Sequence, residues 1–131
     1  MRTLVIDTAT RACSVALFDE DHVIAAAHEV IGRGHAERLL PLIAALPDNG
    51  KADQVMVNVG PGSFTGIRVG VAAAKALGLA WHIDVHGYGC LALVAAMASI
   101  SLRHLMHMDI RVRLYAPSCP MTFRALPRPI W

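Results

Sequence analysis

A glycine-rich stretch between two regular segments constrains the fold of this chain most. Residues 54–59 predict a buried strand, and residues 67–80 predict a helix. Between them lies Gly60-Pro61-Gly62-Ser63-Phe64-Thr65-Gly66, where glycine permits a tight turn and Ser63 is placed to cap the helix. A strand that turns directly into a helix begins a crossover connection, which predicts an α/β fold with parallel strands.

The segments before this turn predict an antiparallel hairpin. Residues 3–6 form a short apolar run that ends at Asp7, and two more strands are expected over residues 12–18 and 23–30. The short polar turn between the second and third strands makes them antiparallel. Residues 35–46 carry a helical apolar stripe that contains Pro41, which predicts a kink or a helix that begins properly near Arg38.

The segments after the turn complete a layered domain. We expect a strand over residues 81–85 and a helix over residues 90–98. The resulting order is β-β-β-α-β-α-β-α, which predicts a mixed sheet covered by helices. Hydrophobic residues make up 55% of the chain, which supplies enough apolar material for its core.

Composition also bears on the compartment. Three cysteines form no Cys-x-x-Cys pair, and this favours a reducing environment. Asp7 interrupts the first apolar run, so no signal peptide is expected, and the uncharged residues 85–102 are too polar in their first half to cross a bilayer. We therefore expect a soluble cytoplasmic protein.

The glycine-rich turn has two interpretations. A helix N-terminus with bare amides favours anions, which predicts phosphate binding by Gly60, Gly62 and Ser63. The spacing, however, matches neither the Walker A loop nor the dinucleotide fingerprint. A capped strand-to-helix turn without a ligand is the favoured alternative on spacing alone.

Small residues recur every four positions along the helix after the turn. They are Gly66, Gly70, Ala74 and Gly78, and they share one nearly bare face. Such a face lets two backbones approach closely. The face packs either on the chain's own sheet or against a helix of another subunit, and the sequence weighs these alternatives about evenly.

Three motifs in the expected order carry a family resemblance. They are Leu4-Val5-Ile6-Asp7-Thr8-Ala9-Thr10 followed by Cys13-Ser14-Val15-Ala16-Leu17, His35-Ala36-Glu37-Arg38-Leu39-Leu40-Pro41-Leu42-Ile43, and Val59-Gly60-Pro61-Gly62-Ser63-Phe64-Thr65-Gly66-Ile67-Arg68-Val69-Gly70. Over about residues 1–98 the chain resembles the TsaB (YeaZ-type) family. The resemblance implies an actin-like, ribonuclease-H-like fold of the ASKHA class.

The resemblance also implies a function. Family members belong to the bacterial machinery that makes threonylcarbamoyladenosine at adenosine 37 of tRNA, and they are not regarded as its catalyst. They pair with a TsaD-type transferase, TsaE is an ATPase partner, tRNA is contacted indirectly, and a homodimer in isolation stays open. The implied interface lies on His35, Arg38, Leu39, Leu42, Gly66, Arg68, Gly70, Ala74 and Gly78.

The resemblance argues against a catalytic or metal centre. If Val85 is matched, the transferase's metal-binding His-x-x-x-His pair falls on Gly87 and Leu91, which cannot bind a metal. The spacing of His82, His86 and Cys90 would need one continuous helix and a fourth ligand for zinc, and glycines oppose that helix. No catalytic residue and no metal site are expected.

Alternative functions start from the first strand. Asp7, Thr8 and Thr10 stand where actin-like ATPases bind phosphate, although a carboxylate that ends a strand often caps turn amides. The alternatives are a nucleotide hydrolase or kinase of that class, a related M22-type peptidase, or an inactive truncated fragment. No tightly bound cofactor is expected, and ATP or ADP at a subunit interface stays open.

The last 33 residues differ from the rest. Residues 1–98 carry seven basic and nine acidic side chains, a net of −2, whereas residues 99–131 carry five arginines and Asp109, a net of +4. Periodicity also stops near Ser99. We expect one domain over residues 1–98 and an atypical basic tail over residues 99–131. The tail is disordered, read out of frame, the product of a truncated gene, or in contact with tRNA phosphates.

Overall fold

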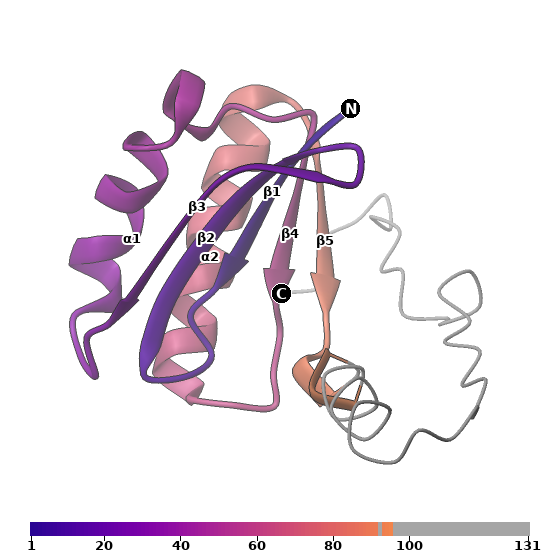
Figure 1. Cartoon of the computed structure of the whole chain (residues 1–131). Coiled ribbons are helices and arrows are strands. Elements are labelled where there is room, and N and C mark those ends of the chain that lie inside the picture. The colour runs from indigo at the N-terminus through magenta and orange to yellow at the C-terminus, as the bar shows by residue number, and fades with distance from the viewer. Residues whose placement is uncertain (92, 96–131) are drawn as a thin grey trace, which may run out of the picture.

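A five-stranded mixed sheet forms the centre of the molecule (Figure 1). The computed structural model describes residues 1–91 and 93–95. The strand order is β3-β2-β1-β4-β5. The first three strands are antiparallel neighbours, and β1, β4 and β5 run parallel. The strands are β1 (Arg2–Asp7), β2 (Ala12–Asp19), β3 (His22–Val30), β4 (Gln54–Asn58) and β5 (Asp84–Tyr88).

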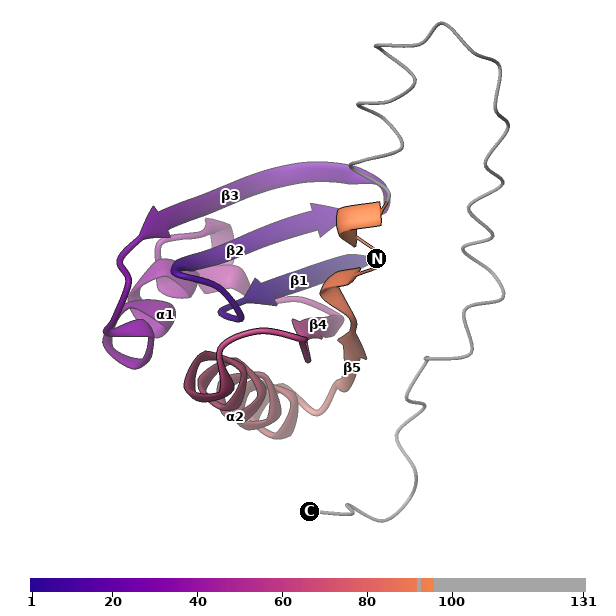
Figure 2. The same ribbon diagram turned by 90° about the horizontal axis from the view of Figure 1, so that it is seen from below.

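Two helices cover one face of this sheet, as Figure 2 shows. They are α1 (His35–Ala44) and α2 (Phe64–Trp81), and the short 3₁₀ turn η1 (Pro47–Gly50) follows α1. Alternate strand residues such as Leu4, Ile6 and Val57 are fully buried or nearly so beneath the helices. This apolar layer confirms the predicted α/β class with a mixed sheet.

Two element boundaries differ from expectation. The helix α1 begins at His35 and continues through Pro41, so the alternative of a start near Arg38 is wrong. The last strand occupies residues 84–88 rather than 81–85, because α2 continues to Trp81 and ends only where His82 adopts a left-handed φ of 55°. Trp81 stays helical because it packs against the hydrophobic core.

The C-terminal expectations fall largely beyond the described residues. Cys90, Leu91 and residues 93–95 are helical, which agrees with the start of the helix expected over residues 90–98. The division at Ser99 and all three interpretations of the basic tail lie outside the residues that the structure describes.

The small-residue face of α2 lies against the chain's own sheet. Gly66, Gly70, Ala74 and Gly78 are all buried. A Cβ atom at Gly66 would fall inside the contact distance of the Thr8 carbonyl oxygen, so only a hydrogen fits there. The structure therefore supports the first alternative, and the prediction that these four residues line a partner interface is wrong.

This close approach predicts that alanine is harmful at Gly66 despite its better helix propensity. Gly66→Ala must push α2 away from Thr8, and we expect it to lower the free energy of unfolding by about 2 kcal/mol in urea denaturation followed by circular dichroism. Ala76→Gly on the exposed side of α2 is the matched control, and it should cost only the propensity difference of about 1 kcal/mol. Unchanged or increased stability of Gly66→Ala would contradict the packing described.

Candidate functional site

A row of polar side chains crosses the sheet at the ends of its parallel strands. In the register of neighbouring strands, Asp7 lies opposite Ser14 and Ser14 lies opposite His28. Asn58 lies opposite Tyr88 in the same way. Asn58 donates a hydrogen bond to Asp7, which joins the two halves of the row. Neighbouring strand residues such as Ile6 and Val57 face the helices, so this polar row lies on the opposite face.

The centre of the polar row holds two strand ends together. Asn58 is fully buried, and its Nδ2 donates to Oδ2 of Asp7 over 2.9 Å. Its Oδ1 accepts the Gly60 amide at 2.8 Å, while Oδ1 of Asp7 accepts the Ala9 amide at 3.0 Å. One carboxylate oxygen of Asp7 thus bonds to the turn after β1, and the other bonds to Asn58, whose side chain holds the turn after β4.

The ends of the polar row differ in character. Burial, followed by the nearby Asp7 carboxylate, raises the pKa of Tyr88. The phenol is therefore neutral at ordinary pH and can act as a hydrogen-bond donor. At the other end, Oγ of Ser14 lies 2.8 Å from Nδ1 of His28 on the sheet surface.

The glycine-rich turn is fastened to the turn between β1 and β2. Oγ of Ser63 accepts the Gly66 amide at 3.3 Å, which confirms the predicted helix cap. The Ser63 amide donates to the Ala9 carbonyl at 2.7 Å, and the Thr8 hydroxyl donates to the Gly66 carbonyl at 2.7 Å. Gly62 lies so close to Ala9 that no side chain fits.

These bonds account for much of the predicted phosphate site. The amides of Gly60 and Ser63 have partners within the chain, and so do both oxygens of Asp7. Thr8 is fully buried, whereas Thr10 is exposed and its Oγ1 accepts the Ala12 amide at 3.2 Å. Phosphate binding by these residues stays a prediction, and the geometry favours the capped turn.

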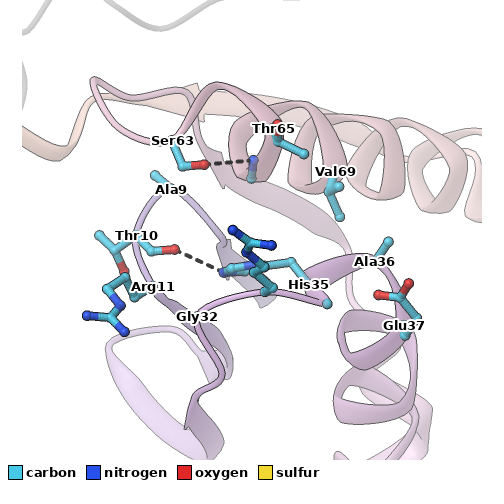
Figure 3. A pocket seen from close by; sticks show the side chains of 13 residues that line it. Ala9, Thr10, Arg11, Gly32, His35, Ala36, Glu37, Ser63, Thr65 and Val69 are labelled. Atoms are coloured by element: carbon cyan, nitrogen blue, oxygen red, sulfur yellow. Dashed lines mark hydrogen bonds between the residues drawn. The ribbon is translucent and has the colours of Figure 1, made fainter.

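A hollow of about 790 Å³ lies beside the glycine-rich turn and the turn between β1 and β2 (Figure 3). It is bounded by residues 9–11 and by the N-terminal ends of α1 and α2. Thr10 and Ser63 of the predicted phosphate site line it, and so does His35, whose Nε2 lies 2.9 Å from the Thr10 carbonyl oxygen. Two helix N-termini make its wall electropositive.

Sequence reasoning missed two basic residues of the hollow. Arg11 and Arg33 both line it, beside the acidic Glu37. Nothing in the spacing of Gly32-Arg33-Gly34 indicates that this segment faces residues 9–11. The fold brings these distant segments together.

The histidines and cysteine at intervals of four do not share a helix. His82 ends α2, His86 lies on β5, and Cys90 follows that strand. Cys90 supports the glycine-rich turn: its Sγ lies 2.8 Å from the Pro61 carbonyl oxygen, and its amide donates to the Gly60 carbonyl at 3.0 Å. Among the described residues, no cluster of three His, Cys, Asp or Glu side chains could hold a metal ion.

The outward side of the helices forms an exposed surface with large apolar side chains. We call the exposed residues Leu40, Phe64, Arg68, Ala72, Ala76 and Leu79 the outer helical surface. Phe64 is 74% exposed and Leu79 is 77% exposed. The Arg68 guanidinium lies 5.2 Å from the centre of the Phe64 ring. In the described part of the chain, no helix is long and apolar enough to cross a membrane.

The remaining predicted interface residues divide into exposed and buried positions. Arg38 is exposed, and its Nε donates to Oε2 of Glu29 at 2.8 Å, so it holds the pKa of that carboxyl below its usual value. Leu39 and Leu42 are buried in the core. Their assignment to a partner interface is wrong, because α1 turns both side chains toward the sheet.

Comparison with known proteins places this geometry in a family context. The family model described as TsaD, tRNA N6-adenosine threonylcarbamoyltransferase, matches residues 23–108. The tRNA threonylcarbamoyladenosine biosynthesis protein TsaB of Escherichia coli (strain K12) is 38% identical over 100 residues, which are 72% of this chain and 43% of that protein. TsaB of Bacillus subtilis (strain 168) is 39% identical over 65% of this chain and 38% of its own length.

The comparison with solved structures points to the same family. YeaZ from Pseudomonas aeruginosa superposes with a TM-score of 0.69 at 36% identity, over 77% of this chain and 49% of that chain. RuvC from T. thermophilus superposes with a TM-score of 0.54 at 9% identity, which shows a shared fold alone. The chain spans less than half the length of these TsaB and YeaZ relatives.

The hydrogen bond between Asp7 and Asn58 predicts how stability changes when the two side chains are exchanged. Asn58→Asp places two carboxylates side by side in a buried position, and we expect a loss of about 3 kcal/mol of unfolding free energy at neutral pH. The exchanged double variant Asp7→Asn with Asn58→Asp keeps a donor for every acceptor, so most of that loss should return. Urea denaturation measures both, and failure of the double variant to recover would contradict the described bond.

Tyr88 predicts a loss of stability in alkali. Its folded pKa lies above the unfolded value of about 10, so above that pH only the unfolded chain releases the proton. The stability is therefore complete below pH of about 10 and declines above it, by at most about 1.4 kcal/mol per pH unit for this group. Denaturation across this pH range should show a shallower decline for Tyr88→Phe than for the unsubstituted chain, and equal slopes would refute the assignment.

Proposed function

The chain belongs to the TsaB/YeaZ family, and from this premise we propose that it is a non-catalytic partner subunit in threonylcarbamoyladenosine formation in tRNA. In this proposal it binds a TsaD-type transferase through the outer helical surface. A TsaE-type ATPase belongs to the same machinery, and tRNA is contacted indirectly. The proposal rests on the family relationship and on one structural observation.

That observation is the chemistry of the outer helical surface. Leu40 is 54% exposed, and Phe64 and Leu79 are more exposed still, on helices that contact one another. Exposed apolar side chains along two neighbouring helices favour a protein contact on this side of the domain. Ala72 and Ala76 lie four residues apart on the outward side, so a partner helix can approach α2 closely there.

The polar row supports a binding role over a catalytic one. An actin-like hydrolase or kinase needs a carboxylate free to act on a nucleotide, whereas both oxygens of Asp7 accept hydrogen bonds from the chain itself. Asn58, the neighbour of Asp7 in the polar row, carries no charge. These contacts favour the proposal of a non-catalytic subunit.

Within the same proposal, the hollow is the site at which ATP or ADP binds. It opens at the N-terminal ends of α1 and α2, and Arg11 and Arg33 line it. Arginine and helix N-termini both favour phosphate groups. We place the phosphates of ATP or ADP here when a partner subunit covers the outer helical surface.

Coexpression with a TsaD-type transferase tests the proposal. Ala76→Lys inserts a long charged side chain into the outer helical surface. We expect it to lower the apparent affinity for the transferase by about tenfold or more, which size-exclusion chromatography shows as a loss of coelution. Ala26→Lys is the matched control, because Ala26 is exposed on β3, away from the outer helical surface. The unsubstituted chain and this control should both coelute with the transferase.

Two results would overturn the proposal. One is the absence of any complex between the unsubstituted chain and the transferase. The other is an Ala76→Lys variant that binds as tightly as the control. Retained circular dichroism of both variants establishes that a loss of binding is not a loss of fold.

A further inference from the structure

An arginine on the outer helical surface is held by an aromatic ring. Among the described residues, Arg68 forms no ion pair with an aspartate or a glutamate. Its guanidinium lies instead over the ring of Phe64, 5.2 Å from the ring centre. The two residues are four positions apart on α2, so their side chains are neighbours on one side of the helix. The ring attracts the cation but does not satisfy its N–H donors as an oxygen acceptor would.

The two helices that form this surface are basic. The 18 residues of α2 contain two charged side chains, Arg68 and Lys75, and both are basic. On α1, Arg38 is bonded to Glu29 of β3, and Glu37 lines the hollow. The two helices together thus carry three basic side chains and one acid, whereas residues 1–98 as a whole have a net charge of −2. This side of the domain suits a partner that brings acidic side chains.

Covering the outer helical surface changes the surroundings of Arg68. It lies between Phe64 and Ala72 on the same side of α2, so a partner that covers these two exposed residues also removes Arg68 from water. Burying a charge without a partner is strongly unfavourable, whereas a carboxylate offers a guanidinium two parallel hydrogen bonds. The helix α2 has no acid that could take this place. The group that pairs with Arg68 in the complex must therefore come from the partner.

We infer that the partner places an aspartate or glutamate carboxylate against Arg68 when it covers the outer helical surface. This inference rests on the proposed function, in which the partner is a TsaD-type transferase. Phe64 is a positioning residue, because its ring restricts the guanidinium before the partner arrives and so reduces the entropy lost on binding. The complementary surface of the transferase is then apolar, with at least one acid among its contacts.

Calorimetric titration of the full 131-residue chain into a nuclease-treated TsaD-type transferase tests the inference. Arg68→Gln keeps a long polar side chain and removes the charge, and we expect it to weaken binding by about thirtyfold or more. Ala26→Glu on the exposed part of β3 is the matched control, because it lowers the net charge by the same amount. Its affinity should be nearly unchanged, since salt screens distant exposed charges.

Two further measurements separate an ion pair from a loss of packing. The affinity of the unsubstituted chain should fall as salt rises, and Arg68→Gln should show a shallower decline because one charge pair is missing. Arg68→Lys should recover part of the lost affinity, since it restores the charge without the planar fork. Phe64→Leu should weaken the unsubstituted chain severalfold and Arg68→Gln less, because the ring acts through the guanidinium.

The inference and the proposed function fail in different ways. A complex in which Arg68→Gln binds as tightly as Ala26→Glu, or declines with salt as steeply as the unsubstituted chain, overturns the inference and leaves the proposed function in place. Binding that depends on Arg68 only when tRNA is added also overturns it, because the anion is then a phosphate. The absence of any complex with the unsubstituted chain overturns both. Retained circular dichroism of each variant excludes a loss of fold as the cause.

Discussion

The close approach of α2 to the sheet determines the rest of the structure. Gly66, Gly70 and Gly78 leave no room for a side chain between the helix and the strands, so the helix packs directly against β1, β4 and β5. This places the first turn of α2 against Thr8 and Ala9, where short hydrogen bonds fix it. The hollow and the outer helical surface both take their positions from that contact.

The hydrogen bonds at the strand ends occupy several polar groups of the phosphate-like motif. A glycine-rich turn at a helix N-terminus binds anions when its amides are free. Here the Gly60 amide bonds to Asn58 and the Ser63 amide bonds to Ala9, and the buried Asn58 also occupies Asp7. Satisfying these buried polar groups within the chain stabilises the turn, and a ligand in the hollow would have to use other groups there, such as Arg11 and Arg33.

Local chemistry predicted the regular elements, and long-range packing decided what it could not. The hairpin, the parallel strands and the Ser63 cap follow from residues that are neighbours in sequence. The bare face of α2 was predicted from its spacing, but spacing shows only that something approaches closely. The hollow went unpredicted because Arg11 and Arg33 lie far apart in the chain from Ser63 and meet only after folding. The last strand was misplaced because Trp81 suits a helix end and a strand start equally well.

Small residues lie on both sides of α2, and the two sides differ in what a substitution would change. Changes among the buried glycines disturb folding, whereas Ala72 and Ala76, two positions out of step with them, are free of contact with the sheet. Substitutions at these outward alanines can therefore change the exposed surface of α2 while the domain keeps its architecture. The outward side of α2 can thus vary in size and charge without a change in the packing beneath it.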